Sequence, residues 1–240
     1  MSEWKARRFW TTAAVEPVAG GWQVTLDGRP VRTPGKQPLV LPSRPLAEAI
    51  VAEWDAQSDV IDPLSMPLTR AANAALEKVG PQVDAVADML AEYGATDLLC
   101  YRADHQQRLA ARQAAAWDPL LDWIAAQGAA LRVTQGVIPV PQDAAALATL
   151  RARLAALSAW ELTALHDLVT LPGSLVLGLA VLDGRITAAE AHDLSRLDEV
   201  FQTEEWGTDD EAEAAAAARR AAMQSAERLL MLLRAQASGD

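Results

Sequence analysis

The chain has 240 residues, of which 51% are hydrophobic, and a formal net charge of −11. This length and apolar content can bury a sizeable core in one large domain or two smaller ones. The acidic balance argues against nucleic acid as the main partner, because phosphate binding needs a basic surface. The single cysteine, Cys100, cannot form an internal disulfide, which indicates a reducing compartment.

The sequence predicts neither a membrane anchor nor a targeting segment. The longest apolar run covers residues 171–182 and is interrupted by Pro172 and Gly173, so it is too short to span a bilayer. The first ten residues, MSEWKARRFW, lack the apolar core of a secretory signal. We therefore expect the protein to stay in the compartment where it is made.

Residues 1–42 predict a small antiparallel β-domain. The strand-like runs RRFWTTAAV, WQVTL and QPLVL are separated by turn signals. The dipeptides Gly20-Gly21 and Asp27-Gly28 favour hairpins, because these residues tolerate a positive φ. The connections are too short for helical crossovers, which favours antiparallel pairing.

Residues 43–240 predict a larger helical bundle domain, so the fold class is α+β. Ser43 is expected to cap a helix that carries Leu46, Ile50 and Trp54 on one face.

Proline and glycine predict several helix ends further along. Ser65 is expected to cap a helix that Gly80 ends. Pro119 is expected to break a helix that begins near His105, with Asp118 capping the next one.

The rest of the chain is predicted to be helical from its caps. Three Ser/Thr and Glu pairs have the spacing of a capping box. They are Ser158/Glu161, Thr187/Glu190 and Thr208/Glu211.

No motif predicts a cofactor, a metal site or a catalytic group. The sequence lacks a phosphate-binding glycine loop, zinc-ligand spacing and a calcium loop. Ser174 is interpreted as the start of a helix and Cys100 as a small buried side chain. We therefore expect no cofactor, no metal and no enzymatic activity.

Large aromatic side chains stand in an acidic stretch near the C-terminus. Residues 183–213 hold eleven acids and two arginines, and a solvated face is the simplest explanation. Gly207 is expected to end the helix that Thr187 opens, which would place Trp206 at a corner between two helices. Glu204 and Glu205 precede this corner, where a helix dipole disfavours acids.

A tryptophan among charges is typical of a binding hot spot, so this corner is the predicted partner-binding site. Its residues are Glu204, Glu205, Trp206, Asp209, Asp210 and Glu211. Asp209, Asp210 and Glu211 also suit the first turn of the following helix, where the dipole favours acids.

Five segments in order resemble the ATP12 family of F1-ATPase assembly chaperones over about residues 5–235. They are LDGRPVRTPGK, LAEAIVAEWDAQ, DLLCYRA, WDPLLDW and LSRLDEVFQTEEWG. The resemblance implies an N-terminal β-domain joined to a helical domain. It also implies a non-enzymatic role, which is binding of the unassembled F1 α subunit before it meets β. With no targeting segment expected, we interpret the chain as a cytoplasmic, bacterial relative that is a monomer when free and is not stably inserted in a membrane.

Two other functions stay open at this point. One is an enzyme or small-molecule binder with a site in the cleft between the domains, built from Asp118, Asp122, His166 and Asp167. His166 and Asp167 are adjacent in a predicted helix and are expected to point apart. The other is a scaffold for a different client protein.

The turn at Asp27-Gly28, with Arg29, Arg32 and Lys36 nearby, is a further place where a partner could bind. We prefer to interpret it as an ordinary hairpin.

Overall fold

The computed structural model describes residues 7–235, and the chain forms two compact units. Unit 1 comprises Met1–Pro81 and Arg228–Asp240, and unit 2 comprises Gln82–Glu227. Within the part of the chain described, every helix is too short or too polar to traverse a lipid bilayer.

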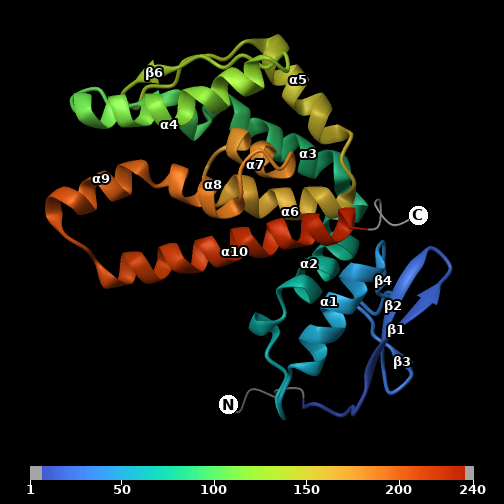
Figure 1. Ribbon diagram of the computed structural model, residues 1–240. Helices are drawn as coiled ribbons and strands as arrows, with labels where there is room; N and C mark the ends of the chain where they lie inside the picture. The colour runs from blue at the N-terminus through green and yellow to red at the C-terminus, as the bar shows by residue number, and fades with distance from the viewer. Residues whose placement is uncertain (1–6, 236–240) are drawn as a thin grey trace. The chain divides into compact units, whose positions relative to one another are not determined.

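Unit 1 contains a four-stranded antiparallel sheet (Figure 1). Its strands are β1 (Ala13–Val18), β2 (Gly21–Leu26), β3 (Arg29–Pro30) and β4 (Val40–Leu41). The long strand β2 pairs with β1, and it also pairs with β3 at Thr25 and Leu26 and with β4 at Trp22 and Gln23. The predicted antiparallel sheet is confirmed.

Both predicted hairpin turns are present. Gly20 has a φ of 88° between β1 and β2, and Asp27 and Gly28 have φ values of 49° and 75° between β2 and β3. A left-handed conformation at both central residues matches the twist of the strands that they join.

Helix α1 (Arg44–Asp55) packs on β1 and β2 within the same unit. Ser43 caps it as predicted, because its Oγ accepts a hydrogen bond from the backbone N–H of Leu46 at 3.3 Å. Leu46 and Ile50 are fully buried. The boundary expected between residues 42 and 43 separates the strands from α1, whereas the compact unit contains both, because the sheet and α1 share one core.

The cap predicted at Ser65 is wrong. Ser65 ends a short 3-10 turn, and the N-cap position of α2 (Pro67–Ala74) is Met66. The first N–H groups of α2 instead bind the carboxylate of Glu53 on α1, with Leu68 N at 2.7 Å and Thr69 N at 2.8 Å. The buried carboxylate of Glu53 therefore caps α2 in place of the Ser65 hydroxyl. A π-helical turn, Ala75–Val79, and a 3-10 turn, Gly80–Gln82, then continue from α2, so Gly80 does not end the helical path.

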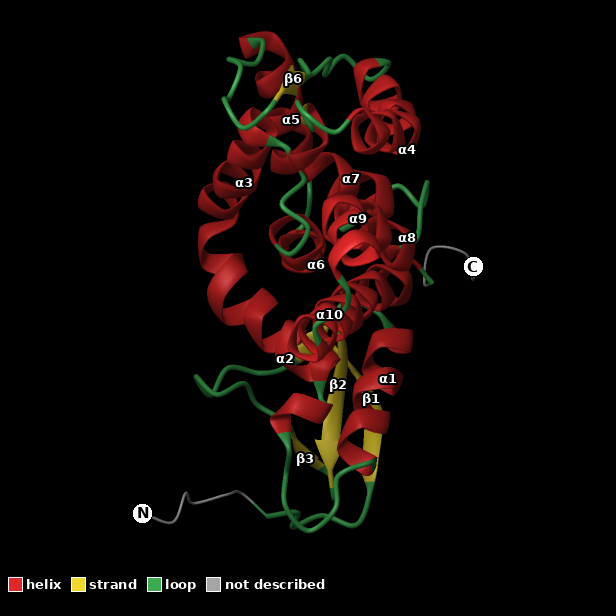
Figure 2. Cartoon of the chain, turned by 90° about the vertical axis from the view of Figure 1, so that its left-hand side faces the viewer, coloured by secondary structure: helices red, strands yellow, loops and turns green. Residues whose placement is uncertain are grey.

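Unit 2 is built almost entirely from helices (Figure 2). They are α3 (Val83–Ala91), α4 (Gln107–Ala125), α5 (Ala144–Ala155), α6 (Ala159–Thr170), α7 (Leu175–Leu182), α8 (Ala188–Ser195) and α9 (Leu197–Trp206). Two short parallel strands, β5 (Tyr101–Arg102) and β6 (Thr134–Gln135), add a second sheet. Helix α10 (Asp210–Arg234) begins in unit 2 and ends in unit 1.

The core of unit 2 centres on α7, all of whose residues are buried. Helices α4, α6 and α8 contact it. Ser174 caps α7 by accepting a hydrogen bond from Leu177 N at 3.1 Å, which confirms its predicted role at a helix start. Cys100 is buried, as predicted.

The helix break predicted at Pro119 is wrong, because α4 continues through this residue. Pro119 and Ala115 are exposed, so the carbonyl that loses its helical partner can bind water instead. Trp117 and Leu120, on either side of the proline, are buried and hold the helix in the core. Asp118 consequently caps nothing, and it forms an ion pair with Arg102 at 2.6 Å.

Two of the three predicted capping boxes are confirmed, at Ser158/Glu161 and Thr187/Glu190. The third is wrong, because α10 begins one residue later than expected. Asp209 Oδ1 accepts hydrogen bonds from Glu211 N at 2.9 Å and Ala212 N at 3.4 Å. The single helix expected to run from Thr187 is two helices, α8 and α9, that meet at Arg196.

A candidate partner-binding surface

The predicted corner tryptophan is strongly exposed. Trp206 is the last residue of α9 and is 85% exposed. Gly207 follows it with a φ of 93°, which ends the helix as predicted. We call the segment of Glu204, Glu205, Trp206, Asp209, Asp210 and Glu211 the α9–α10 turn. All six side chains belong to exposed residues.

Glu204 lies at the C-terminal end of α9, where the helix dipole disfavours an acid, and it has a cationic partner on another helix. Arg112 of α4 donates from Nη1 to Glu204 Oε1 at 2.9 Å and to Oε2 at 3.0 Å. The two residues are 92 positions apart, so no local pattern could have predicted this contact. Within residues 7–235, no hydrogen bond or ion pair involves the side chain of Glu205. Glu205 therefore remains available to a cation from outside.

The acids after Gly207 serve the start of α10. Asp209 caps the helix through its carboxylate, and Asp210 and Glu211 lie in the first turn. Their charges face the positive end of the helix dipole, which stabilises them there. These three residues therefore contribute to local stability while they keep negative charge on the surface.

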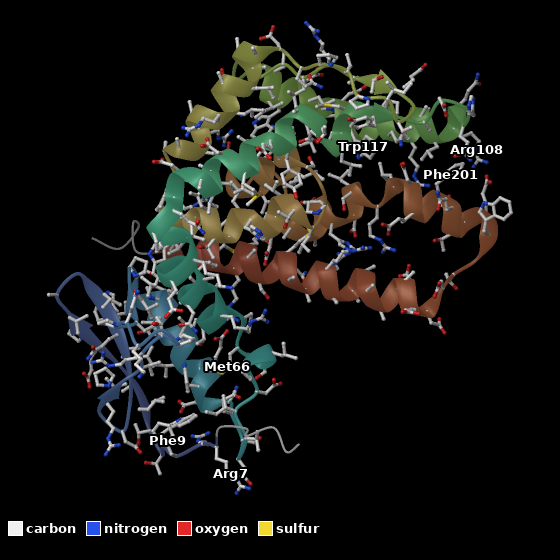
Figure 3. All side chains as sticks on the ribbon, turned by 180° about the vertical axis from the view of Figure 1, so that it is seen from behind. Arg7, Phe9, Met66, Arg108, Trp117 and Phe201 are labelled. Carbon is white, nitrogen blue, oxygen red and sulfur yellow. The ribbon has the colours of Figure 1, made fainter. Side chains whose placement is uncertain are left out.

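Helix α9 is held on α4 by contacts that differ in kind (Figure 3). The buried ring of Phe201 lies 5.9 Å from the guanidinium carbon of Arg108. Gln113 Nε2 donates to Asp198 Oδ1 at 2.6 Å. Next to these contacts, Trp117 Nε1 of α4 donates to the carbonyl of Leu194 at 2.9 Å, which is on the preceding helix α8. The turn that carries Trp206 thus follows a helix that contacts α4 at Asp198 and Phe201.

Ion pairs also join α9 to α10 beside a polar hollow. Arg196 contacts Glu199 at 2.7 Å and Glu213 at 3.0 Å, and Arg219 contacts Glu199 at 3.3 Å. The hollow has a volume of about 600 Å³, and Trp206 and Asp209 line it. The exposed ring therefore stands next to a concave, charged surface.

The four residues considered for an enzyme site do not form one cluster. Asp118 and Asp122 lie on α4, whereas His166 and Asp167 lie on α6. Among the residues described, no hydrogen bond or ion pair joins the two pairs.

His166 and Asp167 were expected to point apart, and this is wrong. Nδ1 of His166 lies 3.0 Å from Oδ1 of Asp167. This hydrogen bond raises the pKa of His166, although partial burial opposes it. Within residues 7–235, no group of three or more His, Cys, Asp or Glu side chains is arranged to hold a metal ion.

Comparisons with known proteins point to one family. A family model described as "ATP12 chaperone protein" matches residues 7–125. The crystal structure of Atp12 from Paracoccus denitrificans has 62% sequence identity to this chain and superposes with a TM-score of 0.94. The match covers 97% of this chain and 100% of the Paracoccus chain. The structure of the Atu1473 protein from Agrobacterium tumefaciens is 40% identical, covers 95% of this chain and 86% of its own, and gives a TM-score of 0.90.

A mitochondrial relative is more distant. The protein atp12 of Schizosaccharomyces pombe is 25% identical over 219 residues, which are 86% of this chain and 75% of the relative.

Proposed function

This chain belongs to the ATP12 family of chaperone proteins, and on that premise we propose that it binds the unassembled α subunit of F1-ATPase. In this proposal the chaperone masks the subunit interface of α and prevents aggregation until α pairs with β. A subunit without its neighbours exposes apolar surface that the complete assembly covers, and such surface aggregates.

The exposure of Trp206 is the observation that carries the choice of contact surface. A tryptophan that is 85% exposed would gain much from burial against a partner. Carboxylates stand on both sides of it, and Glu205 has no partner within the described chain. The complementary surface on α would be an apolar depression with Lys or Arg side chains around it.

Release in this proposal depends on competition. The β subunit displaces the chaperone by covering overlapping surface on α. The chaperone acts by binding alone, without a cofactor or a chemical step, as a monomer in a bacterial cytoplasm. The similarity to proteins from Paracoccus and Agrobacterium supports the bacterial setting.

The test is whether the purified protein keeps isolated F1 α dispersed. Light scattering of diluted α is recorded with rising amounts of chaperone, and affinity is measured by biolayer interferometry. Wild-type protein should suppress aggregation near equimolar ratio. Trp206→Ala and Glu205→Lys should each weaken affinity about tenfold or more.

Matched controls separate a local effect from a general one. Val137→Ala removes another exposed apolar side chain of unit 2, and Glu92→Lys reverses another exposed acid there. Both should bind like wild type. Wild-type protein that neither binds α nor suppresses its aggregation would overturn the function. Normal binding by Trp206→Ala and Glu205→Lys would overturn only the choice of surface.

A further inference from the structure

Unit 1 carries an apolar hollow that the α9–α10 turn does not involve. Its volume is about 330 Å³. Phe9, Val31, Trp54 and Ile61 contribute apolar wall, and Arg29 and Arg32 stand among the lining residues. No lining residue is acidic. We call it the unit 1 hollow.

Aromatic packing holds the wall in place. The ring of Trp10 is buried, and it contacts the rings of Phe9 and Trp54 edge to face, both at 5.2 Å between centroids. Phe9 nevertheless remains 68% exposed (Figure 3). A large ring that is fixed from behind and open to water in front loses little conformational freedom when a partner covers it. The hollow is thus preformed for contact.

The two arginines give the hollow a positive edge. Arg29 and Arg32 are exposed, and neither forms an ion pair within residues 7–235. Arg32 donates from Nη1 to the carbonyl of Lys36 at 3.0 Å, which positions its side chain.

The nearest acid of this turn, Asp27, is already engaged. Its Oδ1 accepts hydrogen bonds from Thr12 N at 2.9 Å and from the Thr11 hydroxyl at 2.9 Å. Hydrogen bonds from Thr12 and Thr11 lower the pKa of Asp27, and the charge of Arg29 lowers it to a smaller extent. The positive edge therefore has capacity for carboxylates from another molecule.

We propose that the unit 1 hollow is a second client-binding surface, which takes an apolar side chain of a polypeptide segment whose neighbouring Asp or Glu residues pair with Arg29 and Arg32. This inference rests on the proposed chaperone function. It also gives the hairpin at Asp27-Gly28 a role beyond that of an ordinary turn, because Arg29 begins β3 directly after this turn and lines the hollow. Arg32 follows β3 and lines the hollow as well.

The openness of the rim favours a polypeptide over a small ligand. Phe9, Arg29 and Arg32 are all exposed, so a small molecule in the hollow would leave much of its surface in water. Small-molecule sites instead bury about 70–90% of their ligand. A chain segment can fill the hollow and also cover the rim. The positive edge selects acidic neighbours on that segment.

The decisive experiment measures the affinity of the full-length protein for isolated F1 α by biolayer interferometry. Arg29→Glu/Arg32→Glu reverses the edge, and Phe9→Ala removes exposed wall. Arg70→Glu/Lys78→Glu is the matched control, because it makes the same charge change at exposed positions of unit 1 that do not line the hollow. We expect the first double variant to bind about tenfold more weakly and the control to change by less than about twofold.

The client chemistry is tested with an array of overlapping F1 α peptides. Wild-type protein should retain peptides in which an aliphatic or aromatic residue has Asp or Glu neighbours, and Arg29→Glu/Arg32→Glu should lose them. Retention of Lys- and Arg-rich peptides instead, or retention of the acidic peptides by Arg29→Glu/Arg32→Glu, would overturn the inference.

The outcomes distinguish this inference from the function on which it rests. No binding of α by wild-type protein removes the proposed function. Binding that Trp206→Ala weakens, but that Arg29→Glu/Arg32→Glu and Phe9→Ala leave unchanged, keeps that function and overturns the second surface. Unchanged melting temperatures show that the variants are folded.

Discussion

The hydroxyl of Ser174 donates a hydrogen bond to Oδ1 of Asp97 at 2.7 Å, across 77 positions of the chain. The same carboxylate also accepts hydrogen bonds from Leu99 N at 3.0 Å and Val176 N at 2.9 Å. Asp97 is completely buried, and burial raises its pKa to about 6 despite these donors. One carboxylate thus joins the start of α7 to the segment before β5.

The raised pKa of Asp97 predicts a pH-dependent part of the stability. Because the pKa in the folded state lies above the ordinary value of 3.8, the folded state binds a proton more readily than the unfolded state. The stabilisation that protonated Asp97 gives to the folded state is therefore complete below about pH 4 and is lost as the pH rises through about 6. Relative to Asp97→Asn, wild-type protein should gain about 2–3 kcal/mol of unfolding free energy between about pH 7 and pH 4. Urea unfolding of both proteins at several pH values measures this difference, and a constant difference would contradict it.

The close approach of α6 and α7 depends on Gly178. A Cβ atom at this position would lie 2.5 Å from Val169 Cγ2 and 3.2 Å from Leu165 Cδ1. Gly178→Ala should therefore lower the free energy of unfolding by about 1–3 kcal/mol, because the core is already packed. Adding Val169→Ala removes the clashing methyl group, so the double variant should be more stable than the sum of the single effects predicts. Strictly additive effects in urea unfolding would show that the two helices can move apart.

Local patterns predicted the elements well where their chemistry is local. The capping boxes at Ser158 and Thr187 satisfy backbone groups within one turn, so the sequence is sufficient to find them. The glycines of the two hairpin turns are also predictable from the sequence, because the positive φ that they adopt is a local requirement of the turn. The overall division into an N-terminal antiparallel sheet and a larger helical part followed from these signals.

The wrong predictions are those in which tertiary contacts replace local ones. Glu53 supplies the cap expected from Ser65, and packing of Trp117 carries α4 through Pro119. At the candidate surface, the position of Trp206 at a helix end followed from Gly207. The pairing of Glu204 with Arg112 could not be predicted, because it depends on how α4 and α9 pack.

The start of α10 can be assigned by mutation. Asp209→Ala removes the carboxylate that binds Glu211 N and should cost about 1 kcal/mol of unfolding free energy. Thr208→Ala should change the stability by less than about 0.5 kcal/mol, because within residues 7–235 no hydrogen bond involves the Thr208 side chain. Thermal unfolding of both variants decides between the two caps. A larger loss for Thr208→Ala would restore the capping box expected from the sequence.

The pair of Arg112 and Glu204 predicts opposite effects on stability and on binding. Both side chains are partly exposed, at 41% and 50%, so a double-mutant cycle of Arg112→Ala and Glu204→Gln should give a coupling of about 0.2–1 kcal/mol. Loss of Arg112 also frees the Glu204 carboxylate for a cation of the client. If the α9–α10 turn binds F1 α through its carboxylates, Arg112→Ala should bind α at least as tightly as wild type, whereas Glu204→Gln should bind it more weakly. Glu205→Gln serves as the comparison, because it should weaken binding without changing the unfolding midpoint. Equal losses of affinity for Arg112→Ala and Glu204→Gln would mean that the intact ion pair, and not a free carboxylate, supports the contact.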